Sequence, residues 1–137
     1  MEKLHGAKIA LIHNGKVVTI LRDDIPSITF PNMWELPGGG CNEGESAFEC
    51  ASREVAEELG INIQETDIVF NAVFPSMHLP DVVAGFMVAK ISDEQVANIV
   101  LGDEGQDWKM MTYNEFLNHK SAIPQLKERL QTYLDSL

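Results

Sequence analysis

The sequence has little positive charge. Lys and Arg together number 10 against 21 Asp and Glu, which leaves a formal net charge of -11 on 137 residues. An anionic surface repels nucleic-acid backbones and acidic lipid headgroups, so we expect neither a nucleic acid nor a membrane as partner. A small anionic substrate would need metal ions or a few placed cations in order to approach such a chain.

Cysteine is scarce as well, and long apolar runs are missing. The two cysteines are Cys41 and Cys50, and their spacing is not that of a metal-binding C-x2-C pair. Two separate thiols in a reducing cytoplasm are the favoured interpretation, with a pairing between them as the alternative. The segment from Met1 to Gly6 lacks the layout of a signal peptide, and no apolar run is long enough to span a bilayer. We therefore expect a cytoplasmic protein.

What is present indicates one α/β domain over residues 1–137. Hydrophobic residues at 45% and charged residues at 23% are ordinary values for a globular chain. Short apolar runs between turn signals predict strands over residues 7–13, 16–21, 33–36, 67–74, 82–91, 100–101 and 108–111. Helical spacing predicts helices over residues 46–59, 114–118 and 124–137, the last with an inward stripe that includes Leu137. Asn14-Gly15 predicts a hairpin turn, and Pro37 to Gly40 a tight turn. This order of elements favours a mixed sheet sandwiched between α-helices.

The helix expected over residues 46–59 carries an unusual group of carboxylates. Glu54, Glu57 and Glu58 stand at i, i+3 and i+4, so they share one narrow arc. Like charges four residues apart destabilise a helix by roughly 0.2–0.5 kcal/mol, and the helix dipole disfavours anions in its last turns. Arg53 balances only part of this charge. Divalent cations bound to the arc would resolve the conflict; glutamates solvated on an exposed face are the alternative.

The stretch from Gly39 to Ile61 places this helix in a longer pattern. It has the form G-x5-E-x7-R-E-U-x-E-E-x-G-U, where U is a bulky aliphatic residue. It resembles, at every specified position, the box of the Nudix hydrolase family. A chance match has a probability on the order of 10⁻⁹ per start site from average residue frequencies. The resemblance implies a Nudix fold and a Nudix pyrophosphohydrolase. Such an enzyme hydrolyses, with a metal ion, a diphosphate linkage in a nucleoside diphosphate joined to another group.

The resemblance also implies a metal site. Its ligands would be the carboxylates of Glu54, Glu57 and Glu58, together with the backbone carbonyl near Gly39. The metal would be Mg²⁺, or Mn²⁺ in its place, because hard cations of this kind take oxygen ligands and share them with substrate phosphates.

Further site residues follow by the same resemblance. Arg53 would orient a glutamate by a charge-assisted hydrogen bond. Glu45 would brace the loop against the helix, and we group it with the substrate-binding residues. Glu104 resembles a further catalytic glutamate, with an exposed loop acid as the alternative. The group that takes the proton from the attacking water stays open between Glu54, Glu58 and Glu104.

Substrate contacts are predicted at two more positions. Arg22 resembles a residue that holds a substrate phosphate, while an ion pair with Asp23 or Asp24 is an equally good interpretation. Trp34 is a candidate for stacking on a base, although core packing is the commoner role of an aromatic residue. The other aromatic candidates are Phe30, Phe74, His78, Phe86 and Trp108. His78 has no second histidine nearby, and we do not expect it to bind metal.

Several functions remain open at this point. The partner is expected to be a small nucleotide-like diphosphate: a nucleoside triphosphate (oxidised ones included), an ADP-ribose-like compound or a dinucleoside polyphosphate. A catalytically inactive Nudix module that senses a nucleotide is the alternative, although inactive members usually lose box carboxylates. An RNA 5′-end hydrolase is disfavoured by the acidic charge. Family members are often dimers, so a homodimer is also considered.

Overall fold

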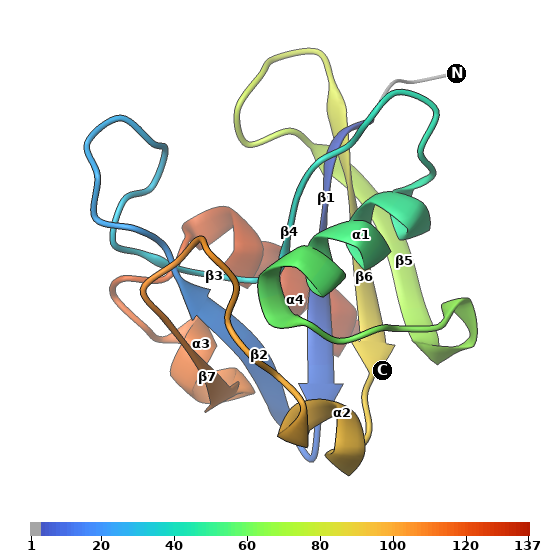
Figure 1. Ribbon diagram of the computed structural model, residues 1–137. Coiled ribbons are helices and arrows are strands. Elements are labelled where there is room, and N and C mark those ends of the chain that lie inside the picture. The colour runs from blue at the N-terminus through green and yellow to red at the C-terminus, as the bar shows by residue number, and fades with distance from the viewer. Residues whose placement is uncertain (1–3) are drawn as a thin grey trace.

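A computed structural model describes residues 4–137 as one seven-stranded sheet with helices on both faces (Figure 1). The strands are β1 (Leu4–His13), β2 (Lys16–Leu21), β3 (Trp34–Glu35), β4 (Gly38–Gly40), β5 (Ile68–Pro75), β6 (Val83–Lys90) and β7 (Asp107–Thr112). The helices are α1 (Ala47–Leu59), α2 (Asp93–Ala97), α3 (Tyr113–Leu117) and α4 (Pro124–Asp135), with a 3₁₀ turn at Glu65–Asp67. No helix within the described range is long and apolar enough to cross a bilayer. The expected mixed sheet between helices is confirmed.

The centre of the sheet is β1, which runs parallel to β6 and antiparallel to β2. The β1–β2 hairpin turns at Asn14-Gly15, where both residues have positive φ (49° and 73°), as the sequence predicts. The two strands pair only next to this turn, at Ile12 with Val17 and at His13 with Lys16. Beyond that point they separate, because β4 pairs with the first half of β1 while β3 pairs with the end of β2. The sheet is therefore split at one end.

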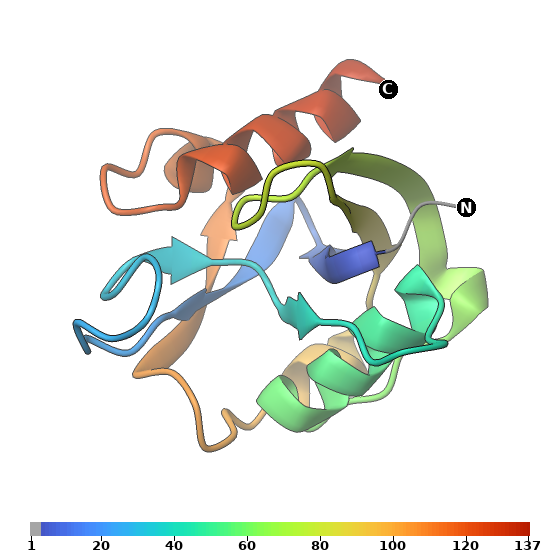
Figure 2. The same ribbon diagram turned by 90° about the horizontal axis from the view of Figure 1, so that it is seen from above.

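Two hydrophobic cores lie on the two faces of the sheet. Alternation along β1 sends Ile9 and Leu11 to the face covered by α1, and Ala10 and Ile12 to the face covered by α4. Figure 2 shows α1 and α4 on opposite sides of the strands, with the β5–β6 loop between α4 and the segment that carries β4. The open end of the sheet thus lies between the two helical layers.

The glycine segment differs from the sequence prediction. Pro37 to Gly40 does not form a tight turn; Gly38–Gly40 forms β4, antiparallel to residues 6–8 of β1. Gly38 has φ +131°, and a Cβ there would lie 2.7 Å from the Cα of Lys8. The backbones of β1 and β4 are so close that only glycine fits, which is why the segment pairs as a strand.

Smaller differences concern the second half of the chain. Residues 100–101 are not a strand, and the short helix α2 was not predicted. The C-terminal helix ends at Asp135, and Leu137 is 84% exposed, so its predicted inward position is wrong. The helix ends before it can carry this residue to the core.

The cysteines also differ from the favoured interpretation. Cys41 and Cys50 form a disulfide, with their Cα atoms 5.1 Å apart. Cys41 follows β4 directly, and Cys50 is fully buried in the first turns of α1. The loop from β4 to α1 folds back on itself and brings the two together, so the prediction of separate thiols is wrong.

Candidate active site

Helix α1 begins and ends where the sequence predicts. The hydroxyl of Ser46 accepts a hydrogen bond from the backbone N–H of Glu49, and the Glu49 carboxylate accepts one from the N–H of Ser46. Gly60 ends the helix in the left-handed conformation, at φ 68°. These caps fix the rotation of α1, so that Val55 and Leu59 enter the core while the carboxylates lie beside β4.

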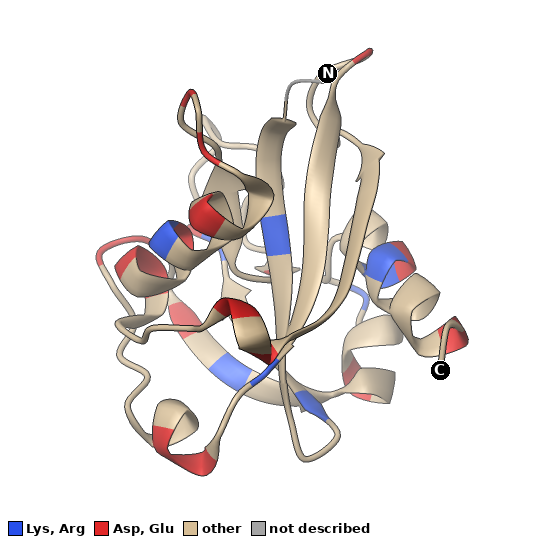
Figure 3. Cartoon of the chain, turned by 90° about the vertical axis from the view of Figure 1, so that its right-hand side faces the viewer, with Lys and Arg blue, Asp and Glu red and all other residues tan. Residues whose placement is uncertain are grey.

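Arg53 organises the outer part of the site. Its guanidinium donates to both oxygens of Glu45 (2.8 and 3.0 Å), to Glu54 (2.9 Å) and to the carbonyl of Gly40 (2.9 Å), and it lies 3.4 Å from Glu57. These hydrogen bonds raise the pKa of Arg53 and lower that of Glu45. Glu45 thus links the loop before α1 to Arg53 on the helix; its contact with substrate stays a prediction. Figure 3 shows acidic and basic segments side by side on α1.

Glu58 lies deeper than the other helix carboxylates. It accepts a hydrogen bond from the backbone N–H of Gly38 at 2.8 Å. Burial raises its pKa to about 8; the positive charge of Lys8 and the bond from Gly38 act in the opposite direction, while Glu35 and Glu54 raise the pKa further. A carboxylate in this position is costly to ionise unless a cation comes close, so the site favours a positively charged ligand.

A buried carboxylate bridges the split in the sheet. Glu35, on β3, accepts from Lys8 Nζ at 2.6 Å and from Arg22 Nη1 at 3.1 and 3.2 Å. The side chains are 7% exposed for Glu35, 11% for Lys8 and 21% for Arg22. Arg22 therefore pairs with Glu35, and the suggested pairing with Asp23 or Asp24 is wrong. The reason is the strand pairing of β2 with β3, which sets Leu21 opposite Trp34 and so brings the neighbouring residues together.

A cavity of about 270 Å³ joins these groups. It lies at the open end of the sheet and is lined by three basic and four acidic side chains: Lys8, Arg22, Arg129, Glu35, Glu54, Glu58 and Glu104. An adjoining hollow adds Glu57 and Asp103. The acidic side chains outnumber the basic ones, so a polyphosphate would enter only together with a cation.

The donor set fits a hard divalent cation. All the candidate groups are carboxylate or carbonyl oxygens, which Mg²⁺ and Mn²⁺ prefer. Gly39 lies directly against Glu54, since a Cβ on it would be 2.8 Å from the Glu54 carboxylate. Across residues 4–137, no three His, Cys, Asp or Glu side chains are gathered into a metal-binding group as they stand. Arg53 and the N–H of Gly38 hold the glutamates instead, so the ligand roles of Gly39, Glu54, Glu57 and Glu58 stay predictions.

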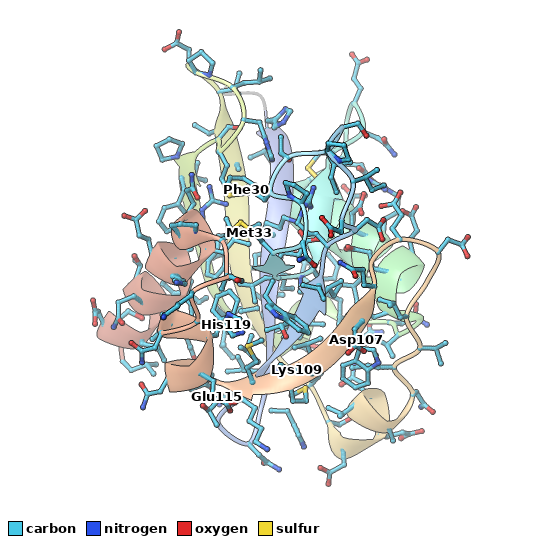
Figure 4. The ribbon with its side chains drawn as sticks, turned by 90° about the vertical axis from the view of Figure 1, so that its left-hand side faces the viewer. Phe30, Met33, Asp107, Lys109, Glu115 and His119 are labelled. Carbon is cyan, nitrogen blue, oxygen red and sulfur yellow. A yellow bond between two sulfur atoms is a disulfide. The ribbon has the colours of Figure 1, made fainter. Side chains whose placement is uncertain are left out.

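The remaining predicted residues lie in different surroundings. Glu104 is exposed on the loop before β7 and lines the cavity opposite α1, which suits an additional catalytic carboxylate. Trp34 is not among the residues that line the cavity. It packs against His119, with ring centroids 6.3 Å apart, and under the ammonium of Lys109 at 5.0 Å. Lys109 on β7 and His119 beyond α3 mark this outer side in Figure 4. The role of Trp34 in substrate binding stays a prediction.

Sequence reasoning missed three charged residues of the cavity. Lys8 is a cation in an otherwise apolar strand, and Glu35 stands between Trp34 and Leu36. Arg129 follows two charged residues but falls on the buried face of α4, next to Leu130. A charge on the inward side of a strand or helix is the signal that could have singled them out, because a buried charge is normally paired or used for binding. Among the aromatic candidates, His78 lines the cavity, while Phe86 is fully buried.

Known proteins resemble this chain in sequence. The family model described as NUDIX domain matches residues 3–133. A putative 8-oxo-dGTP diphosphatase from Bacillus subtilis (strain 168) is 41% identical over 54 residues, which cover 39% of this chain and 32% of that protein. The nucleoside triphosphatase NudI from Salmonella arizonae is 33% identical over 94 residues, 64% of this chain and 67% of that protein.

A solved structure shows the same fold. A bifunctional NMN adenylyltransferase/ADP ribose pyrophosphatase from Francisella tularensis, in complex with AMP and a Mn ion, superposes with a TM-score of 0.78 at 16% identity. The match covers 99% of this chain and 42% of that one. The fold and the site define an α/β domain with a carboxylate-lined cavity at the open end of its sheet. The chain belongs to the NUDIX domain family.

Proposed function

We propose that the protein hydrolyses a diphosphate linkage in a nucleoside diphosphate joined to another group, with the help of a divalent metal. The observation that carries this proposal is the single cavity that joins Glu54, Glu58 and Glu104 to Arg22 and Lys8. Carboxylate oxygens for a cation and cationic groups for phosphate are what such a substrate requires. Relatives named as a diphosphatase and a nucleoside triphosphatase support the same chemistry.

Mg²⁺ or Mn²⁺ would be held by Glu54, Glu57 and Glu58 with the carbonyl of Gly39. The Mn ion of the Francisella structure supports this choice of metal. When bound, such an ion would neutralise phosphate charge and lower the pKa of a bound water. The raised pKa of Glu58, which a nearby cation would reverse, supports the same assignment.

Side chains of the protein would position a metal ligand, bind a phosphate and accept the proton of the attacking water. Arg53 holds Glu54 at 2.9 Å and so limits its rotation toward solvent. Arg22 would hold a substrate phosphate at the inner end of the cavity, where Glu35 keeps its guanidinium in place. The proton of the attacking water would pass to Glu54, Glu58 or Glu104. Glu104 is the most exposed of the three, and so the freest to move.

A panel assay tests the proposal. Release of phosphate and pyrophosphate would be measured for nucleoside triphosphates, 8-oxo-dGTP, ADP-ribose and dinucleoside polyphosphates, each with Mg²⁺, with Mn²⁺ and with a chelator. We expect metal-dependent release from at least one compound. No release from any of them, combined with nucleotide binding, would instead support the alternative of a nucleotide-sensing module.

Substitution of the helix glutamates gives a sharper test. We expect Glu57→Gln and Glu58→Gln each to lower turnover by more than about 100-fold, because loss of a mere supporting partner of a metal ligand already costs 10- to 100-fold. The circular dichroism spectrum should not change, since neither side chain is part of the core. Glu43→Gln, an exposed acid in the loop before α1, is the matched control. Near-normal activity of both variants would contradict the proposed site.

A further inference from the structure

Arg129 is a buried cation with an unused donor. It comes from α4 and is only 2% exposed. Its Nη2 donates to the carbonyl of Pro75 at 3.0 Å, and its guanidinium stacks over the Phe74 ring at 5.3 Å from the centroid. Within residues 4–137, its Nη1 has no hydrogen-bond partner, and no carboxylate forms an ion pair with it. A buried donor without an acceptor costs free energy, so a ligand that supplies the acceptor would recover it.

The position of Arg129 tells which part of a ligand it could meet. It forms part of the wall of the cavity that also holds Glu54 and Glu58. The loop from Ser76 to His78 lines the same wall, and this loop lies between α4 and the β4 segment in Figure 2. A substrate with its diphosphate at the helix glutamates would extend toward this wall with the group attached to the diphosphate.

The surroundings of Arg129 favour a flat ring over a second phosphate. The other cationic groups of the cavity, Lys8 and Arg22, already share the Glu35 carboxylate. The lining of the same cavity also includes His5 and His78, whose rings are 5.6 Å apart in an edge-to-face contact, with Phe30 at 6.3 Å from His78. Aromatic surfaces of this kind stack on a nucleobase.

We infer that Arg129 is a specificity-determining residue of the proposed hydrolase: its free Nη1 donates a hydrogen bond to a carbonyl oxygen on the nucleobase of the substrate. The inference rests on the proposed function. The single Nη1 donor matches the O6 acceptor of guanine or the O4 acceptor of uracil and thymine, whereas adenine has no carbonyl oxygen and presents an amino donor at the corresponding position. The preferred substrates are therefore nucleotides of guanine, uracil or thymine, with adenine nucleotides disfavoured.

Another role for Arg129 needs its own control. Gln125 lies one helical turn before it on α4, and the Gln125 Oε1 is also buried without a partner among the described residues. Rotation of both side chains would let them bond to each other, in which case Arg129 would serve the packing of α4 only. Gln125→Leu removes this acceptor and leaves the cavity wall unchanged, because Gln125 lines only the adjoining hollow beside Phe74.

The test measures binding, so it is independent of turnover. Dissociation constants for GMP, UMP, AMP and pyrophosphate would be determined by titration calorimetry with Mg²⁺, on the wild type, Arg129→Met, Arg129→Lys and Gln125→Leu. We expect the wild type to bind GMP and UMP more tightly than AMP. Arg129→Met should weaken GMP and UMP binding roughly 10- to 150-fold, the value of one hydrogen bond from a charged donor, and leave AMP and pyrophosphate binding nearly unchanged. The GMP and UMP affinities of Arg129→Lys, which keeps one donor group, should lie between those of the wild type and Arg129→Met.

Three results would overturn the inference. The first is a wild type that prefers AMP, a result that stands even if Arg129→Met fails to fold. The second is an equal loss for pyrophosphate and GMP, which would make Arg129 a phosphate ligand. The third is the same selectivity change in Gln125→Leu, which would make the role structural. Failure of the hydrolase proposal itself would appear separately, as absent turnover with base selectivity intact.

Discussion

The backbone of Gly39 packs against the carboxylate of Glu54, so the space at Gly39 determines where this candidate metal ligand lies. We expect Gly39→Ala to push the Glu54 carboxylate away, since the new Cβ would lie 2.8 Å from it. Metal affinity and turnover should both fall, by roughly 10- to 100-fold as for a lost supporting partner. Gly40→Ala is the matched control, because a Cβ there meets only the carbonyl of His5, at 3.9 Å. Mg²⁺ titration of the two variants checks this, and equal affinities would contradict it.

Glu45 and Arg53 offer a pH-dependent test at the same scale. Hydrogen bonds from Arg53, then from the N–H of Asn42, lower the pKa of Glu45 in the folded protein. A lowered folded pKa contributes stability above the unfolded pKa of about 4.3 and loses it as the pH falls through the folded pKa. Glu45→Gln should therefore be less stable than wild type at pH 7, with the difference shrinking as the pH falls below the unfolded pKa of about 4.3.

Urea unfolding from pH 7 down to pH 3 measures this difference. Glu43→Gln is the control, as Glu43 is exposed in the same loop and takes part in none of the ion pairs found in the described part of the chain. A constant gap between Glu45→Gln and the wild type across the range would show that the carboxylate contributes through something other than its charge.

At the scale of elements, the link between β4 and α1 sets the geometry of the site. Gly39 on β4 and Glu54 on α1 face each other, and the Cys41–Cys50 disulfide closes the loop between their elements. A cross-link over this short loop stabilises the fold by about 2–3 kcal/mol in the loop-entropy account. Disulfides are rare in the cytosol, so the pairing stands against the predicted cytoplasmic location, which stays a prediction.

Reduction tests this link directly. We expect a reductant to lower the free energy of unfolding of the wild type by about 2–3 kcal/mol, and to have no effect on a Cys41→Ser/Cys50→Ser double variant. Mass spectrometry after alkylation without reductant should show no modified cysteine. Two alkylated thiols in protein that is unfolded in denaturant without reductant would contradict the pairing.

At the scale of the whole molecule, the buried Lys8–Glu35 pair joins the two halves of the split sheet. Lys8 belongs to the half built on β1, and Glu35 to the half in which β3 pairs with β2. We expect Glu35→Leu to destabilise the protein by about 3–5 kcal/mol, because Lys8 and Arg22 lose the buried carboxylate that they share. Lys8→Met added to this variant should restore part of the loss.

Chemical unfolding of the two single variants and the double variant completes this cycle. If the double variant loses as much as the sum of the singles, the two side chains do not stabilise each other. The cost of Glu35→Leu would then come from changed packing, and the halves of the sheet would be held by backbone pairing alone.

How far sequence reasoning reaches depends on the distance in the chain over which a feature acts. The Asn14-Gly15 turn and the capping box at Ser46 act within a few residues, and both were predictable from local rules. The same holds for the arc of Glu54, Glu57 and Glu58, since helical spacing alone brings them together. The NUDIX domain assignment rests on this stretch and is confirmed.

The tertiary structure decided what depends on contacts between distant segments. Lys8 meets Glu35 across 27 residues, and Arg129 meets the carbonyl of Pro75 across 54. Strand β4 and the Cys41–Cys50 pairing likewise depend on how closely β1 and α1 approach this segment. Local sequence patterns do not predict such contacts between distant segments, because the packing of the whole sheet determines them. The sequence by itself determined the carboxylates that would hold the metal, and only the fold placed Lys8, Arg22 and Arg129 around them.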